Sequence, residues 1–212
     1  MKTQFGRGEI EGPLALEETQ KTESRRSVRG IDFFRGFLRS PEQVGSIIPS
    51  SRFMERRIVS LSELDGPLTV VELGPGTGGT TRAILEAMRP DARLLTIELD
   101  PKFSEILNEI GDPRLLPHTG SATDLGAILA EYGLPAPDVV ISGIPFSTMP
   151  REVGTEIIQA IHDCLPPGGR FVAYQFRGHV GRLGRPIMGQ PEVEFELLNV
   201  PPMRFYRWRK PS

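Results

Sequence analysis

Cysteine is nearly absent from this sequence of 212 residues, and aromatic residues make up only 7% of it. The single Cys164 excludes an internal disulfide and a cysteine-based metal cluster. Its apolar neighbours at helical spacing indicate a buried structural thiol. The three histidines are scattered along the chain and give no metal-ligand spacing. We therefore expect no bound metal.

Long apolar runs are missing as well. No stretch approaches the roughly 18 residues needed to span a bilayer, and residues 1–29 lack the apolar core of a signal peptide. These absences predict a cytoplasmic protein. The length predicts one main domain with a short N-terminal extension, and we expect a monomer. Residues 1–24 are predicted to be a mobile polar arm.

The net charge of −2 conceals two basic stretches. Between residues 25 and 57 eight arginines outnumber three acidic residues, and residues 204–210 add four cations and no acid. Such stretches indicate an anionic partner, or else the solvated faces of helices and strands. Charge alone leaves both interpretations open.

Short apolar runs alternate with helical patterns from residue 67 onward. The patterns predict strands at 68–73, 93–98, 114–117, 138–142 and 170–175. They predict helices at 31–38, 52–64, 79–88, from 101 onward, 124–132 and 151–165. Strands separated by helices of this length form a parallel sheet with right-handed crossovers.

The last part of the chain departs from this alternation. The strand-like runs 193–200 and 203–210 are joined only by Pro201 and Pro202, and so short a connection forces an antiparallel pair. Residues 177–190, with four glycines and three arginines, are predicted to be a loop that forms an active-site flap. Residues 66–212 are therefore predicted to form an α/β domain with a Rossmann-like, mostly parallel seven-stranded sheet ending in an antiparallel hairpin.

A glycine-rich turn follows the first strand of this domain. Gly74, Gly76 and Gly78 lack a Cβ atom, so the backbone can turn tightly and approach a ligand closely. This spacing also satisfies the pattern of nicotinamide sites, so the glycines alone do not decide between cofactors. Glu98 ends the next strand, where it can accept hydrogen bonds from both ribose hydroxyls of an adenosine, and Leu99 is suited to packing on the adenine.

Two further positions bear on the cofactor. Glu72 directly precedes the turn, as in class I S-adenosylmethionine-dependent methyltransferases, where a carboxylate faces the methionine end of the cofactor. Ser121 and Ala122 follow the third strand, where the adenine edge would lie. Ser121 can equally be an ordinary helix cap. With the final hairpin, these positions favour S-adenosylmethionine over a nicotinamide, which would make the chain an oxidoreductase.

Four segments are similar to a narrower family, the soluble bacterial phospholipid N-methyltransferases, which are close to the ribosomal RNA adenine dimethyltransferases. The segments are 37–51, 71–78, 141–146 and 199–203, and the resemblance covers residues 31–210. It implies N-methylation of phosphatidylethanolamine towards phosphatidylcholine, with S-adenosylmethionine as the methyl donor. It also implies that Ser46 and Ile47 reach the cofactor.

The RNA-modifying relatives carry an asparagine after the fourth strand that holds the target adenine amine. This sequence has Gly143 there, and it ends at residue 212, which leaves no room for a C-terminal RNA-binding domain. Both differences make a nucleic acid partner unexpected. The backbone carbonyls of Ser142 and Gly143 remain able to accept hydrogen bonds from an amine. An ornithine lipid, a small molecule or an rRNA adenine stay open as alternative acceptors.

Amine methylation requires loss of a proton, because only the neutral lone pair attacks. With a lysine-like pKa of about 10.4, selecting the neutral amine at pH 7 costs about 4–5 kcal/mol. Tyr174 and His179 are the candidates for handling the proton, although either can be purely structural. Phe146, Tyr174 and Phe176 are predicted to form an aromatic wall around the methylated cation, with Arg177 on the same acceptor side; core packing is the alternative for Phe176.

Residues 25–65 are predicted to form a helical lid that contacts the membrane. The membrane-contacting residues would be Arg29, Phe33, Phe34, Arg35, Phe37 and Arg39. This predicts peripheral association with the anionic inner face of the cytoplasmic membrane. Two alternatives remain: a helix that only covers the sheet and buries its phenylalanines, and a non-enzymatic module that binds S-adenosylmethionine or membranes.

Overall fold

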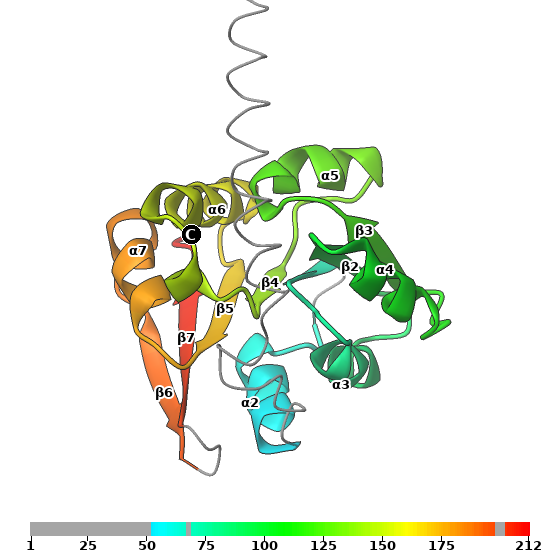
Figure 1. Ribbon diagram of the computed structural model, residues 1–212, viewed down its shortest axis with the longest axis horizontal. Helices are drawn as coiled ribbons and strands as arrows, with labels where there is room; N and C mark the ends of the chain where they lie inside the picture. Colours follow the sequence, from blue (N-terminus) through cyan, green and yellow to red (C-terminus); the bar gives the residue numbers. More distant parts are fainter. Residues whose placement is uncertain (1–51, 67–68, 198–201) are drawn as a thin grey trace, which may run out of the picture.

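The computed structural model describes residues 52–66, 69–197 and 202–212. Its strands form one seven-stranded sheet in the order β3-β2-β1-β4-β5-β7-β6 (Figure 1). The strands are β1 (Thr69–Leu73), β2 (Arg93–Glu98), β3 (Leu115–Thr119), β4 (Val139–Ser142), β5 (Arg170–Gln175), β6 (Glu192–Glu196) and β7 (Met203–Arg209). Strands β1 to β5 pair in parallel, and β7 lies antiparallel between β5 and β6. The predicted α/β fold is confirmed.

Helices cover both faces of this sheet (Figure 1). They are α2 (Arg52–Ser62), α3 (Gly79–Ala87), α4 (Pro101–Asn108), α5 (Leu125–Glu131), α6 (Arg151–Cys164) and α7 (His179–Met188), with short 3₁₀ turns η2 (Ala122–Asp124) and η3 (Phe146–Thr148). The buried residues of α2 and α3 form one apolar cluster with the sheet, and those of α5, α6 and α7 form a second on the opposite face.

Most predicted elements are confirmed within a residue or two. Helix α2 stops at Ser62 because Glu63 adopts a left-handed conformation, φ 49°. Helix α4 begins at Pro101, and the carboxylate of Asp100 accepts a hydrogen bond from the Lys102 amide at 3.0 Å. The third strand begins one residue later and ends two residues later than predicted. The predicted helix 31–38 and the arm 1–24 lie outside the described residues.

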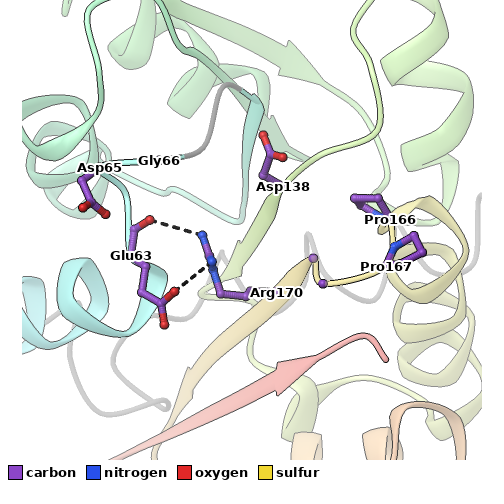
Figure 2. Close-up of a pocket in the computed structure, with 9 residues that line it drawn as sticks. Glu63, Asp65, Gly66, Asp138, Pro166, Pro167 and Arg170 are labelled. Carbon is purple, nitrogen blue, oxygen red and sulfur yellow. Dashed lines mark hydrogen bonds and ion pairs between the residues drawn. The ribbon is translucent and has the colours of Figure 1, made fainter. Parts of the chain in front are cut away.

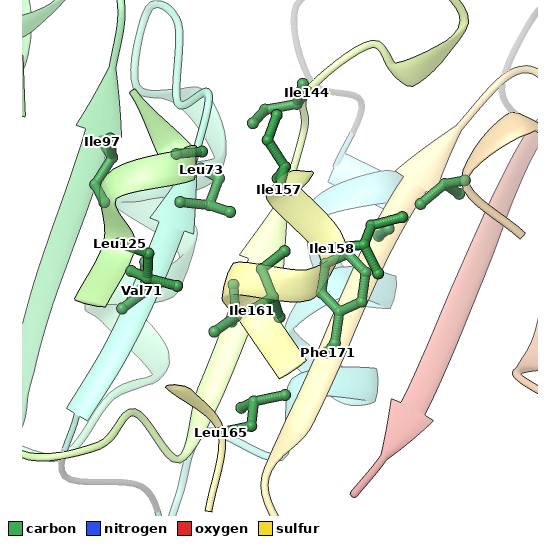
Figure 3. Close-up of a cluster of buried hydrophobic side chains, with 14 of the residues drawn as sticks. Val71, Leu73, Ile97, Leu125, Ile144, Ile157, Ile158, Ile161, Leu165 and Phe171 are labelled. Carbon is green, nitrogen blue, oxygen red and sulfur yellow. The ribbon is translucent and has the colours of Figure 1, made fainter. Parts of the chain in front are cut away.

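The larger apolar cluster lies between α6 and the sheet. Ile157, Ile158 and Ile161 of α6 meet Val71 of β1 and Phe171 of β5 in this cluster (Figure 3). Burial of about 25 cal/mol per Å² of apolar surface makes such clusters the main stabilising term of a fold. Cys164 at the end of α6 packs against the cluster, and burial raises the pKa of its thiol. A thiol held protonated in this way is a poor nucleophile, as expected from the sequence.

The predicted flap at residues 177–190 is wrong, because this segment is the helix α7. Its glycines serve packing rather than mobility. A Cβ on Gly181 would come within 2.7 Å of the Tyr206 ring, and one on Gly184 within 2.6 Å of the Trp208 ring. These two rings stack with Phe171 in a row across β7 and β5, at centroid distances of 5.2 and 5.9 Å. Only glycine lets the helix backbone lie this close to the aromatic row.

Replacing Gly184 with alanine should therefore destabilise the fold by about 1–2 kcal/mol, because the added methyl group overpacks a tight contact. Gly126→Ala is the matched control: Gly126 is also helical, and its nearest contact, the Cys164 sulfur, would be 3.5 Å away. The control should be neutral or slightly stabilising. Urea unfolding followed by the fluorescence of Trp208, the single tryptophan, measures both. Equal midpoints for the two variants would contradict the packing role of α7.

Candidate functional site

The glycine-rich turn joins β1 to α3 at the carboxyl end of the sheet. Gly74, Gly76 and Gly78 all have left-handed backbone, with φ of 70°, 55° and 81°, where a side chain would be strained. A Cβ on Gly76 would meet no atom within 4 Å, so the space above the turn is open. At this edge of a parallel sheet, open backbone is suited to a ligand.

Glu98 holds this turn to the end of β2. One carboxylate oxygen accepts the Gly76 amide at 3.2 Å, and the other accepts the Leu99 and Asp100 amides at 2.8 and 3.3 Å. Burial raises the pKa of Glu98, while these hydrogen bonds act in the opposite direction. A carboxylate has about four acceptor positions, so three are used by backbone. About one acceptor position of Glu98 therefore remains, and the two ribose hydroxyls of the predicted contact would have to share it.

Glu72 is fully buried on β1, two residues before the turn. Its Oε2 accepts a hydrogen bond from the Thr81 hydroxyl at 2.7 Å, and its Oε1 has no partner among the described residues. Burial, with a smaller contribution from the charge of Glu98, raises the pKa of Glu72 to about 7. A buried oxygen without a donor costs free energy unless a ligand satisfies it. An ammonium group beside the turn would do so, which fits the methionine end of the predicted cofactor.

Gly143 lies beside Tyr174 at the ends of β4 and β5. A Cβ on Gly143 would overlap the Tyr174 hydroxyl, and it would lie 2.8 Å from the ring carbon Cζ and 3.1 Å from the carbonyl oxygen of Gly74. The hydroxyl of Tyr174 is 3.4 Å from that of Thr80. Position 143 must therefore be a glycine for Tyr174 to occupy this place.

The phenol of Tyr174 is poorly suited to taking a proton. Burial and the charges of Glu72 and Glu98 raise its pKa well above the ordinary value, although the hydrogen bond with Thr80 acts in the opposite direction. The phenol is therefore un-ionised at neutral pH. In that state it can accept a hydrogen bond from an amine without removing a proton. Tyr174, one of the two residues predicted to handle the proton, is therefore limited to orienting the amine.

The predicted aromatic wall is not assembled. Phe146 is only 2% exposed and belongs to the apolar cluster under α6, whereas Tyr174 packs against the cluster on the opposite face. Phe176 is exposed, so the alternative that it packs in the core is wrong. Phe176, Arg177 and His179 instead line a common cavity where α7 begins. Phe146 and Tyr174 thus lie in clusters on different faces of the sheet.

The remaining cofactor candidates lie at the same edge of the sheet. Ser121 caps η2, because its hydroxyl accepts the Thr123 amide at 3.3 Å, so its alternative as a cap is confirmed. Ala122 is buried, and Leu99 is half-buried against the larger apolar cluster. Ser142 is buried on β4, and its hydroxyl accepts the Ile144 amide at 3.2 Å. These placements leave their contacts with a cofactor as predictions.

Other predicted residues lie outside the part of the chain that the structure describes. They are the cofactor residues Ser46 and Ile47 and the membrane residues Arg29, Phe33, Phe34, Arg35, Phe37 and Arg39. Conversely, sequence reasoning missed Thr81, which binds Glu72, and Gln175, whose amide donates to the Ile144 carbonyl at 2.6 Å. Both are ordinary polar residues in regular elements, and no local pattern distinguishes them.

A second pocket, of about 340 Å³, lies at the opposite edge of the sheet, where β4 and β5 begin (Figure 2). Glu63 there bonds Arg170 at 2.9 Å, Arg207 at 3.1 Å and Arg209 at 3.0 Å. Burial opposes ionisation of Glu63, but the hydrogen bond from Arg209 and the three positive charges hold its pKa below the ordinary value. The carboxylate thus joins the end of α2 to the sheet. Ligands of such sheets bind at the carboxyl edge, so this pocket is structural.

Two features are absent from the described residues, and both bear on other classes of protein. Within residues 52–66, 69–197 and 202–212, no group of three histidine, cysteine or acidic residues is arranged to hold a metal ion. Over the same residues, no helix is both long and apolar enough to cross a bilayer.

Sequence comparison identifies relatives among the methyltransferases. A family model described as ribosomal RNA adenine dimethylase matches residues 42–116. An ornithine lipid N-methyltransferase of Singulisphaera acidiphila is 30% identical over 177 residues, which are 82% of this chain and 92% of that protein. A ribosomal RNA small subunit methyltransferase A of Caulobacter vibrioides is 37% identical over 106 residues, but these are only 37% of its length.

Solved structures share the fold. N-methyltransferase NodS of Bradyrhizobium japonicum superposes with a TM-score of 0.63 at 15% identity, over 78% of this chain and 98% of that one. Its complex with S-adenosylhomocysteine gives a TM-score of 0.60 at 14% identity, over 76% and 89%. Identities this low establish the Rossmann-like architecture alone.

Proposed function

The chain belongs to the class I S-adenosylmethionine-dependent methyltransferases, in the family of the ornithine lipid N-methyltransferase and the ribosomal RNA adenine dimethylases, and we propose that it methylates the amine of a membrane lipid. The chain is an N-methyltransferase, and S-adenosylmethionine is its methyl donor. Our first candidate acceptor is phosphatidylethanolamine, converted towards phosphatidylcholine. An ornithine lipid, the substrate named for the relative from Singulisphaera acidiphila, is the alternative.

The contact between Gly143 and Tyr174 is the observation that carries this proposal. The rRNA enzymes that the sequence resembles use an asparagine side chain at this position to hold an adenine amine. Here the Tyr174 hydroxyl fills the space that a side chain at 143 would need. The site therefore offers an amine one phenol oxygen and the carbonyls of Ser142 and Gly143, and no amide group that reads a nucleobase.

Each residue has a distinct contribution in the proposed reaction. S-adenosylmethionine supplies a methyl group activated by its sulfonium. Glu72 and the glycine-rich turn hold its methionine end, and Glu98 with Leu99 holds its adenosine. Tyr174 orients the acceptor amine. His179 is the remaining candidate for taking the proton, since burial and the charges of Arg182 and Arg177 lower its pKa and keep the imidazole neutral at pH 7.

Labelled S-adenosylmethionine and acceptors of defined chemistry test the proposal. Vesicles containing phosphatidylethanolamine, vesicles containing ornithine lipid, and ribosomal RNA transcripts are offered separately. We expect label in lipid, and methylated lipids by mass spectrometry when the chain is expressed in a host that lacks them. Transfer to RNA and to neither lipid would reject a lipid acceptor.

We further propose that residues 25–65, predicted from the sequence to be a helical lid, bring the enzyme to an anionic membrane surface. Near such a surface each arginine is worth about 1 kcal/mol. Replacing Arg29, Arg35 and Arg39 together with glutamate should abolish sedimentation with anionic vesicles while S-adenosylhomocysteine still binds. Vesicle association that survives this replacement would exclude these arginines as the attachment.

Glu98→Ala should weaken S-adenosylhomocysteine binding by about 2 kcal/mol, roughly 30-fold. The carboxylate holds the Gly76 amide and the end of β2 in place, so its loss releases the turn that contacts the cofactor. Glu105→Ala on the exposed side of α4 is the matched control, with unchanged affinity expected. Isothermal titration calorimetry measures both variants. If the two bind equally, the cofactor does not depend on Glu98.

A further inference from the structure

A basic cavity of about 520 Å³ opens where β5 ends and α7 begins. Among the residues that the structure describes, no acidic side chain lines it. The side chains that give the cavity its character are Phe176, Arg177, His179, Arg182, Arg185 and Arg204. Of these, Arg204 comes from the start of β7 and the others from β5's end and α7, so the tertiary fold gathers the positive charge in one place.

The four guanidinium groups of this cavity form none of the salt bridges found among the described residues. The arginines in those salt bridges are six others: Arg57, Arg89, Arg114, Arg170, Arg207 and Arg209. Arg204 instead lies over the ring of Phe195, 5.6 Å from its centroid. Four like charges around one cavity create a positive potential that attracts an anion.

The nearest carboxylates of the hairpin point away from this cavity. Successive residues of a strand face opposite sides of a sheet. Glu192, Glu194 and Glu196 of β6 lie on the α2 side, where Glu192 pairs with Arg207 and the other two with Arg57. Phe195 pairs with Arg204 across the hairpin, on the α7 side. The strand alternation thus separates these acids from the cavity arginines, and no carboxylate of the described residues compensates the cavity charge.

The start of α7 adds donors to the same place. Gly178 is the N-cap of α7, and in the described part of the chain the helix has no side-chain cap hydrogen bond from this position. The Nη1 of Arg204 would be 3.1 Å from a Cβ on Gly178, so its guanidinium lies over this helix end. The positive field is felt locally, because the charges of Arg182 and Arg177 add to burial in lowering the pKa of His179. Uncapped amides and guanidinium groups converge on a space suited to an oxyanion.

The cavity adjoins the proposed acceptor site. Tyr174 and Gln175 end β5, and Phe176 of the cavity is the next residue. The side chain of Gln175 donates to the Ile144 carbonyl at 2.6 Å, which fastens this strand end to the segment that follows β4. Tyr174 packs on the α2 face of the sheet and the cavity opens on the α7 face. Two extended residues span only about 7 Å, so a headgroup that contacts both would lie across the carboxyl end of β5.

We propose that this cavity binds the anionic group of the lipid acceptor, a phosphodiester or a carboxylate, and thereby places the acceptor amine beside Gly143 and Tyr174. This inference rests on the proposed function, that the acceptor is a membrane lipid. In phosphatidylethanolamine an ethylene unit and an ester oxygen separate the amine from the phosphate, and in an ornithine lipid a short carbon chain separates the free amine from the carboxylate. Guanidinium groups bind both anions through paired hydrogen bonds.

Kinetics in micelles of a nonionic detergent test this assignment. The acceptors are phosphatidylethanolamine, ornithine lipid and a long-chain amino alcohol that has an amine and no anionic group. We expect Arg182→Ala and Arg204→Ala each to raise KM for a lipid acceptor about 10-fold, and the double variant about 100-fold. KM for the amino alcohol should change less than about 2-fold. Arg93→Ala, an exposed arginine at the start of β2, is the matched control.

The outcomes separate the possible sources of the anion. An effect on phosphatidylethanolamine alone identifies a phosphodiester, and an effect on ornithine lipid alone identifies a carboxylate. Equal losses for both lipids and the amino alcohol, or an unchanged KM for both lipids, would overturn the proposal. Circular dichroism of the double variant checks that α7 and the sheet remain folded.

A binding measurement separates this proposal from the proposed function. Calorimetry with inorganic phosphate and with glycerophosphoethanolamine should detect binding to the wild type and to Arg93→Ala, and at least about 10-fold weaker binding to the double variant. Such binding together with transfer to neither lipid would reject the lipid acceptor and retain an anion site. The opposite outcome is transfer to lipid with a KM that the arginine variants do not change, and no binding of either probe. That outcome would retain the lipid acceptor and reject the anion site.

Discussion

Gly143→Ala is expected to lower kcat/KM for the acceptor by about 100-fold. The new Cβ would overlap the Tyr174 hydroxyl and lie 2.8 Å from its ring carbon, so the ring must move. Displacement of an orienting group by about 1 Å can cost 10²-fold in rate. The Gly74 carbonyl, 3.1 Å from the same Cβ, blocks the simplest backbone adjustment.

Two comparisons show whether the loss comes from Tyr174. Gly66→Ala is the control for the glycine itself, because a Cβ there meets no atom within 4 Å, and wild-type activity is expected. Tyr174→Phe keeps the ring and removes the hydroxyl, so it should lose activity without moving the backbone. Steady-state transfer to lipid measures all three variants. Wild-type kcat/KM in Gly143→Ala would show that the position of Tyr174 does not matter for transfer.

The parallel part of the sheet was predictable from sequence because each of its strands is a short run bounded by turns. Strand β1 is buried at every position, as expected when helices cover both faces of a parallel sheet. The glycine-rich turn and Glu98 were placed at the correct edge for the same reason, since carboxyl ends of parallel strands share one edge. Ser121 was equally open to two interpretations, and only its hydrogen bond to Thr123 identifies the cap.

The helix α7 was missed because glycine has two opposite uses. Glycines are typical of mobile loops, but Gly181 and Gly184 are three residues apart and face one side of a helix. Their partners, Tyr206 and Trp208, lie more than twenty residues later and approach only in the folded sheet. Local pattern cannot reveal such a contact. The basic cavity was missed for the same reason, because Arg204 and Arg182 line one cavity only when α7 lies beside β7.

The close contact between Gly143 and Tyr174 likewise brings together the residue that follows β4 and a residue of β5. In the sequence each had its own interpretation: the glycine as a lost amide group and the tyrosine as a candidate for the proton. The structure relates them, since one side chain fills the space that the other position leaves open. The raised pKa of Tyr174 then follows from its burial near Glu72, which no spacing in the sequence indicates.

Glu72→Gln is expected to stabilise the cofactor-free protein at pH 8 by about 3 kcal/mol and to have little effect near pH 4.5. Burial raises the pKa of Glu72 from 4.5 to about 7 in the folded state. Between these values the folded protein keeps a proton that the unfolded chain has lost, so stability falls as pH rises and is constant above about 7. The difference of about 2.5 units, at about 1.4 kcal/mol per unit, sets the size of the effect.

Glutamine removes this charge and can still accept the hydrogen bond from Thr81. Urea unfolding at several pH values, followed by Trp208 fluorescence, measures the gain, and Glu105→Gln on the exposed side of α4 is the control without an expected gain. A gain equal at pH 5 and pH 8 would mean that burial of the charge is not its origin. The same variant should bind S-adenosylhomocysteine more weakly, because the unpartnered oxygen of Glu72 is then a neutral amide. A variant that is more stable yet binds as tightly as the wild type would leave the buried carboxylate without a function in the cofactor site, since only binding would offset its cost to folding.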